Sequence, residues 1–201
     1  MDFQAALDSD SVKLQGMAAF FLPSEGLNGL RHLPALLRCC KKVVVTEAEL
    51  PKNELGLIRF GPVALGDLVG QAGFDNENPL HCDILDWLIQ SASSSNLELS
   101  AAAIWGLGML RTAQPKAVES LVSFIEGNRR EVEHELISLR AIALRMLARI
   151  DIRLAVQYRK TDTWKELRRW YEGRQSDTPT VWLRDEFTWM LEAESHNTGE
   201  Q

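Results

Sequence analysis

Two short clusters of histidine, cysteine and carboxylate side chains come nearest to a catalytic or metal-binding motif. His81, Cys82 and Asp83 are consecutive, but neighbouring residues of a helix point in different directions, so these three cannot meet at one site. His134 and Glu135 begin a zinc-protease helix motif that lacks its second histidine. We therefore expect no catalytic residue, no metal and no cofactor, although an active site assembled from scattered residues stays open.

The cysteines and the lengths of the apolar runs indicate the cellular compartment in which the protein is expected. Cys39, Cys40 and Cys82 are too few for a disulfide framework and lack the paired spacing of a zinc site, so we interpret them as small buried hydrophobes. No stretch approaches the run of about 18 apolar residues that a membrane span needs. Residues Met1 to Asp10 lack the basic and apolar regions of a signal peptide. We expect a cytoplasmic protein with no membrane partner.

Charge is distributed unevenly along the chain. The formal net charge is −6, which works against nucleic acid as a partner because phosphate binding needs a positive surface. Residues 129–174 nevertheless carry 12 basic and 7 acidic side chains, whereas residues 1–128 carry 9 and 15 and residues 175–201 carry 1 and 6. The sequence therefore predicts a basic band between two acidic ends.

A row of arginines is the most specific pattern within this band. Arg145, Arg149 and Arg153 stand four residues apart, so they line one side of a helix if that helix continues through Asp151. Like charges at this spacing cost about 0.2 to 0.5 kcal/mol per pair, and an acidic partner would remove that cost. The alternative is a solvated helix face whose arginines pair with nearby carboxylates.

Arginine and tryptophan are also the residues enriched at binding hot spots. Four of the six tryptophans follow Asp151: Trp164, Trp170, Trp182 and Trp189. These rings either seal the end of the fold or leave one ring exposed for a partner. The partner-binding candidates are Trp105, Arg111, Arg140, Arg145, Arg149, Arg153, Trp164 and Arg168.

The elements that position these residues are predicted to be helices. Paired amphipathic segments joined by short polar turns recur in four blocks, at residues 1–22, 26–70, 79–112 and 115–150. The clearest block begins at Pro115, which suits the first turn of a helix. Its first helix ends at Gly127, and its second apolar stripe begins at Leu136.

We predict one all-α domain over residues 1–195, in which residues 151–195 form capping helices and residues 196–201 a disordered tail. The stretch Val43 to Val45 is ambiguous, because three β-branched residues suit either a single strand or a buried loop. Gly61, Gly66, Gly106 and Gly108 lie inside predicted helices. There we expect them to permit close helix packing rather than to bind a ligand.

The second helices of these blocks resemble those of HEAT repeats, in which an Asp-rich turn and Val-Arg precede an Ala-rich helix ending in Ala-Leu-Gly. Matching segments are Asp10-Ser11-Val12-Lys13, Ala18-Ala19, Ala64-Leu65-Gly66 and Ala101-Ala102-Ala103-Ile104 with Gly106 and Gly108. Pro34 is similar to the kinking proline of many first helices in that family. The motif's arginine is Lys13 in the first block and an apolar residue in the others, which departs from the family.

This resemblance covers about residues 5–150 and implies a short right-handed α-α superhelix of HEAT-like or ARM-like repeats with a C-terminal helical cap. It also implies a non-catalytic module that binds another protein through its second helices. The most specific hypothesis is a bacterial adaptor or toxin-immunity protein that occludes its partner. Two alternatives stay open: a HEAT-like alkylpurine DNA glycosylase or other nucleic-acid-binding protein, and a self-associating structural subunit of a larger assembly.

Overall fold

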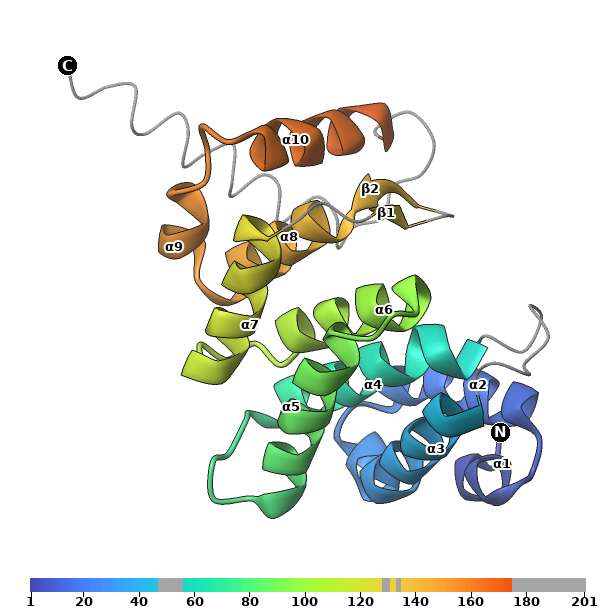
Figure 1. Ribbon diagram of the computed structural model, residues 1–201. Helices are drawn as coiled ribbons and strands as arrows, with labels where there is room; N and C mark the ends of the chain where they lie inside the picture. The colour runs from blue at the N-terminus through green and yellow to red at the C-terminus, as the bar shows by residue number, and fades with distance from the viewer. Residues whose placement is uncertain (47–55, 128–130, 133–134, 175–201) are drawn as a thin grey trace. The chain divides into compact units, whose positions relative to one another are not determined.

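The structure is a computed structural model that describes residues 1–46, 56–127, 131–132 and 135–174. Helices dominate these ranges (Figure 1), so the prediction of an all-α fold is confirmed. The chain divides into two compact units, Met1–Thr112 and Ala113–Gln201, where the sequence predicts one continuous domain. The boundary between the units lies between the third and fourth predicted blocks.

The first unit contains six α-helices and one 3-10 helix within its described residues. They are α1 (Phe3–Asp8), α2 (Val12–Phe21), η1 (Leu22–His32), α3 (Leu33–Thr46), α4 (Gly56–Ala72), α5 (Pro79–Ala92) and α6 (Leu97–Met109). Side chains of Ser11, Asn78 and Asn96 accept hydrogen bonds from the free N–H groups that open α2, α5 and α6. These polar residues therefore fix where three of the helices begin.

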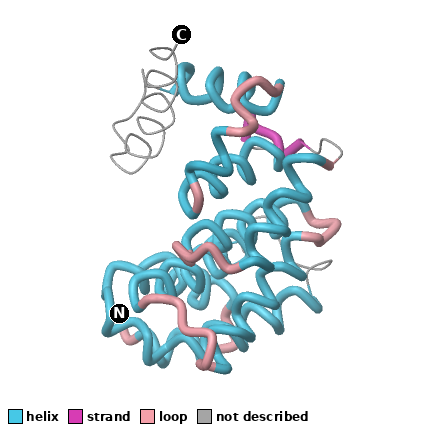
Figure 2. The backbone as a smooth tube through the Cα atoms, turned by 90° about the vertical axis from the view of Figure 1, so that its left-hand side faces the viewer, coloured by secondary structure: helices cyan, strands magenta, loops and turns pink. Residues whose placement is uncertain are grey.

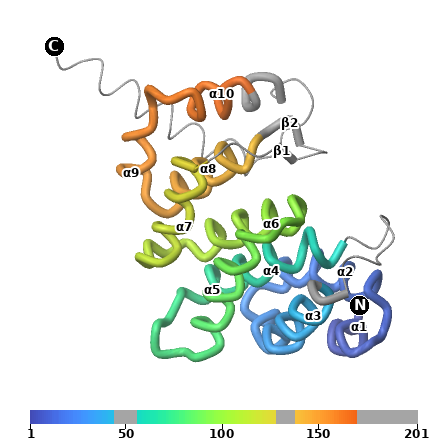
Figure 3. The backbone as a smooth tube through the Cα atoms, viewed as in Figure 1, coloured from blue at the N-terminus to red at the C-terminus, as the bar shows by residue number. Residues whose placement is uncertain are grey.

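Helices of the first unit alternate between two rows, which can be followed along the tube in Figure 3. Helix α4 packs against α2 on one flank and α6 on the other, and α3 and α5 pack on α4 and α6. Aliphatic side chains fill the space between the rows, among them Leu36, Leu65, Leu68, Ile104 and Leu107, all fully buried. The burial of these apolar side chains is the main stabilising contribution.

Helical glycines allow the second helices of the blocks to approach each other closely. A Cβ atom at Gly66 would overlap the Gly106 carbonyl, and one at Gly106 would lie 2.5 Å from the Pro62 carbonyl oxygen. A Cβ at Gly16 would come within 2.8 Å of the Leu57 nitrogen. The prediction that helical glycines serve packing is therefore confirmed at Gly66 and Gly106.

Two expectations for the second block are corrected. Pro34 is the second residue of α3, where a proline fits the first helical turn and causes no kink; the proline inside a helix is Pro62 of α4. Residues Val43 to Val45 lie within α3, because helix packing overrides their β propensity. Most of the connector between this helix and the next, residues 47–55, lies outside the described residues.

The second unit contains a short β-hairpin in addition to helices. Its elements are α7 (Pro115–Glu126), β1 (Glu131–Val132), β2 (Glu135–Ser138), α8 (Leu139–Ile150), α9 (Ile152–Val156) and α10 (Asp162–Arg174). Strands β1 and β2 pair antiparallel (magenta in Figure 2) where the sequence predicts a polar turn. Leu136, predicted on a helix, therefore belongs to a strand. Helix α8 packs against α7 and α10, and the predicted helix at residues 178–194 lies outside the described residues.

Candidate functional site

Exposed apolar side chains gather at the start of the chain. Among the described residues, the large hydrophobic side chains that remain exposed are Met1, Leu14, Met17, Phe20, Phe21, Leu27 and Phe60. Four of them, Met17, Phe20 and Phe21 of α2 and Phe60 of α4, form what we call the aromatic face. Contiguous exposed apolar surface of this kind typically marks an interaction site.

The rings of the aromatic face contact one another across two helices. The Phe20 ring centroid lies 4.9 Å from that of Phe21 and 4.9 Å from that of Phe60, both in edge-to-face geometry. Phe20 and Phe60 are nevertheless 55% and 39% exposed. Gly16 allows the backbones of α2 and α4 to approach closely, and the rings of Phe20 and Phe60 meet across the same two helices while remaining open to solvent.

Two ion pairs continue this surface from α4 to α6. Arg59 Nε and Nη2 each donate to the Glu98 carboxylate at 2.8 Å, and Arg111 Nη2 lies 3.5 Å from Asp67 Oδ1. Val63 lies between Arg59 and Asp67 at helical spacing, and Trp105 of α6 is partly exposed two turns after Glu98. The second helices of the first unit thus present apolar groups and charges that are paired within the unit.

The predicted arginine stripe is wrong. Helix α8 ends at Ile150, and Asp151 is extended, with φ −150° and ψ 92°, and caps the next helix through Leu154 N–H. Arg153 therefore belongs to α9, and the three arginines do not share one helix face. Arg145 is only 3% exposed, so it faces the interior of the second unit rather than a partner.

The other predicted contact residues have varied environments. Arg140 Nε donates to the Ile125 carbonyl at 2.7 Å and so ties α8 to α7. Arg149 is partly buried, and Arg153 and Arg168 are exposed. Arg111 has a φ of 52°, the left-handed conformation that often ends a helix. Its side chain is paired with Asp67.

Of the two tryptophans predicted to contact a partner, the structure leaves only Trp105 partly exposed among the described residues. Trp164 is 4% exposed, which agrees with a sealing role and not with a contact. The side chains of Trp170, Trp182 and Trp189 lie outside the described residues. Trp105 is thus the predicted tryptophan contact that reaches the described surface.

The side chains of His81, Cys82 and Asp83 engage three different partners, as their spacing predicts. His81 Nδ1 accepts from the Asp75 amide at 3.1 Å, Cys82 Sγ donates to the Asn76 carbonyl at 3.3 Å, and Asp83 accepts from Lys41 Nζ at 2.7 Å. Burial lowers the pKa of His81 below its usual value, against the opposing effect of the Asp75 charge. Within the described ranges, no group of three or more His, Cys, Asp or Glu is placed to hold a metal ion.

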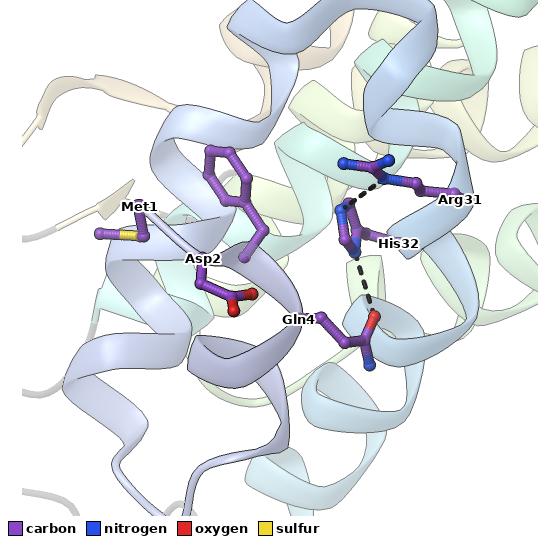
Figure 4. A pocket seen from close by; sticks show the side chains of 6 residues that line it. Met1, Asp2, Gln4, Arg31 and His32 are labelled. Atoms are coloured by element: carbon purple, nitrogen blue, oxygen red, sulfur yellow. Dashed lines mark hydrogen bonds between the residues drawn. The ribbon is translucent and has the colours of Figure 1, made fainter.

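An open hollow of about 510 Å³ lies beside the start of the chain, lined by Met1, Asp2, Phe3, Gln4, Arg31 and His32 (Figure 4). Arg31 Nε donates to His32 Nε2 at 3.1 Å, so the ring proton of His32 is on Nδ1, which faces Gln4 Oε1 at 3.1 Å. Both ring nitrogens are therefore used within the protein. His32 is also only 6% exposed, and its two hydrogen bonds tie Arg31 and Gln4 to the wall of this hollow.

No protein-family model matches the sequence, and neither a curated protein nor a solved structure is significantly similar to the chain. No described helix is both long enough and apolar enough to cross a membrane.

The aromatic face is not among the sites that the sequence predicts. A signal was present: α2 carries apolar residues all round, from Val12 through Met17 to Phe21. A helix of this kind has more apolar surface than one neighbouring layer can cover. Which side would be left uncovered depended on the close approach of α4.

Proposed function

We propose that this chain is a non-catalytic protein-binding module built as a short right-handed α-α superhelix of HEAT-like repeats. The alternation of its helices supports this arrangement: α2, α4 and α6 neighbour one another in one row, and α3 and α5 each pack on the second helix of their own block. Such repeats present an extended surface for a partner. The packing of α10 on α8 supports the further proposal that the C-terminal helices act as a cap.

The observation that carries the binding function is the aromatic face. Phenylalanine rings are large and rigid, and their removal from water on binding contributes free energy in proportion to the apolar area covered. Charges on the neighbouring surface of α4 and α6 are already paired, as Arg59 with Glu98 and Arg111 with Asp67. A partner can therefore cover this surface without leaving those charges without a counterion.

We place the contact on the second helices of the first unit, with Trp105 at its far side, and no longer on the arginines of α8. A bacterial adaptor or toxin-immunity protein is the most specific form of the proposal, because occlusion of a partner needs a contact surface and no reactive group. The exposed arginines Arg153 and Arg168 remain secondary candidates.

The test is affinity capture from native lysate with mass-spectrometric identification, comparing the natural chain with a variant that carries Phe20→Ser and Phe60→Ser. Phe124→Ser, which removes a partly exposed ring from α7 in the other unit, is the matched control. We expect one protein to be captured by the natural chain and by the control but not by the double variant. Capture that all three chains share, or none at all, would remove the support for this function.

A further inference from the structure

We infer that the aromatic face, together with the exposed Leu14 one turn before Met17 on α2, receives one amphipathic α-helix of a partner protein, whose apolar side is flanked by lysine or arginine. This inference rests on the proposed function and specifies the chemistry of its partner. It is carried by the open end of the helix row, the spacing of the exposed groups, and the charges that border them.

Helix α2 ends the row that α4 and α6 continue. Among the described elements, α2 contacts α4 within this row, and its other contacts are with α1, η1 and α3. The terminal repeat of a helical stack normally turns a polar face outward, because no further repeat covers it. Here the outward side of α2 carries Leu14, Met17 and Phe21, all exposed. That end therefore lacks the polar face of a cap.

The exposed groups have the spacing that a helix recognises. Leu14, Met17 and Phe21 stand three and four residues apart and so line one side of α2. This stripe is about 10 Å long, given a rise of about 1.5 Å per residue, which equals about two turns of a helix laid beside it. An added helix would pack on α2 as α4 already does, with its own residues at i, i+3, i+4 and i+7.

The charges around the stripe favour a basic partner. Asp10 is fully exposed just before α2, with only a weak contact of 3.9 Å to Lys42 Nζ, and Glu25 is exposed four residues after Phe21. Residues 1–112 together carry 13 acidic and 8 basic side chains. Lysine or arginine beside the partner's apolar stripe would therefore gain attraction at both ends of α2.

The same charges disfavour the other macromolecules that bind exposed aromatic residues. Anionic lipid surfaces and nucleic acids both attract positive patches, and the first unit is net negative. Two lysines border this region, and each has Asp10 nearby: Lys13 follows Asp10 by three residues, and Lys42 Nζ lies 3.9 Å from Asp10 Oδ1. A basic amphipathic helix fits both the apolar stripe and its borders.

Two synthetic peptides of about 18 residues, long enough to form a helix on contact, test the inference. Both carry the same leucine and phenylalanine stripe; one is flanked by lysine and the other by glutamate. Their binding to the full chain is measured by fluorescence anisotropy at low and high salt. We expect the lysine-flanked peptide to bind at least about tenfold more tightly than the other at low salt, with the difference shrinking as salt screens the charges.

Variants of the chain locate the contact. Met17→Ser with Phe21→Ser should lower the affinity for the lysine-flanked peptide by about tenfold or more. Asp10→Lys should reduce the difference in affinity between the two peptides. Phe124→Ser should change neither the affinity nor this difference. Equal affinity for the two peptides, or an unchanged affinity in the Met17/Phe21 variant, would overturn the inference. Loss of folding is checked by circular dichroism of each variant.

Alternative occupants are tested with the same variants. Sedimentation velocity of the natural chain would reveal a second copy on this face if Met17→Ser with Phe21→Ser abolished a dimer, and flotation with neutral phosphatidylcholine vesicles would reveal a lipid surface. Either result, without peptide binding, overturns the amphipathic-helix inference. A partner captured from lysate through Phe20 and Phe60, with no preference between the peptides, would leave the proposed function standing and remove only this inference.

Discussion

The outer side of α2 and the inner side of α8 reverse the usual distribution of polarity. Phe20 and Phe60 are 55% and 39% exposed, although their rings are apolar, whereas Arg145 is 3% exposed, although arginine is a charged residue. Single exposed apolar residues are common on protein surfaces, but a contiguous set is not. Buried arginine is rare in any fold.

These two regions therefore teach different lessons about what an unusual residue means. At α2 the rings of Phe20 and Phe60 contact each other and are still 55% and 39% exposed, so the packing within the first unit covers only part of them. Their exposure is consistent with binding. At α8 the burial of Arg145 indicates a structural role within the second unit, because a buried charge must be compensated by its surroundings.

The largest effect that would sharpen this comparison is expected from reversing the charge of Arg145. Arg145→Glu should lower the free energy of unfolding by about 3 kcal/mol or more, because it buries a carboxylate where the structure accommodates a cation. Arg153→Glu, on an exposed residue of α9, should change it by less than about 0.5 kcal/mol. Urea denaturation of both variants measures the difference, and equal stabilities would show that Arg145 is not buried in solution.

The next effect concerns the close approach of α4 and α6, the two helices that continue the row from α2. Gly66→Ala should cost about 1 to 3 kcal/mol, because its Cβ would overlap the Gly106 carbonyl. Gly56→Ala in the same helix is the control, since a Cβ there would meet its nearest atom at 3.7 Å. Thermal unfolding of the two variants should separate them. A Gly66→Ala protein as stable as the control would contradict the described contact between α4 and α6.

A smaller effect is expected from the exposed rings themselves. Phe20→Ser should lower the free energy of unfolding by about 1 kcal/mol or less, the typical value of an aromatic pair. Leu22→Ala, at a fully buried position directly after α2, should cost about 2 to 5 kcal/mol. Chemical denaturation measures both variants. If Phe20→Ser lowered the free energy of unfolding as much as Leu22→Ala, the Phe20 ring would belong to the core and would not be part of an exposed binding surface.

The smallest effect comes from a buried group that, unlike arginine, can lose its charge. Burial lowers the pKa of His81, so below its ordinary value near 6.5 the unfolded chain binds a proton that the folded chain does not. Stability should therefore fall as the pH decreases from about 6.5 towards the lowered pKa. His81→Gln, whose amide oxygen can still accept from Asp75, should flatten this part of the profile. An unchanged slope in unfolding experiments across that range would contradict the prediction.

Local chemistry made much of the helical framework predictable. Proline at the first turn marks the beginnings of α5 and α7 in the sequence and in the structure alike. The predicted first block, residues 1–22, contains α1 and α2, joined by a short polar turn as expected. The interhelical glycines were also interpretable, because few other reasons place glycine inside a helix.

The hairpin of β1 and β2 and the end of α8 at Ile150 were harder to predict from the sequence. The strands at Glu131–Val132 and Glu135–Ser138 are too short to give an alternating pattern. Helix α8 ends before Asp151, and the Asp151 side chain caps α9. Aspartate can either cap a new helix or lie within a continuing one, so the sequence does not show which of the two occurs. Continuing the helix through Asp151 produced the mistaken arginine stripe.

The sequence by itself thus determined the kind of structure, its helix starts and the division into blocks, because caps, prolines and apolar periodicity act over a few residues. Only the tertiary structure decided which side of each helix is covered. The exposure of Phe20 and the burial of Arg145 both depend on how closely a neighbouring helix approaches, and that distance is set by residues far away in the chain. Local sequence patterns do not determine that distance, so the candidate binding surface could be identified only from the tertiary structure.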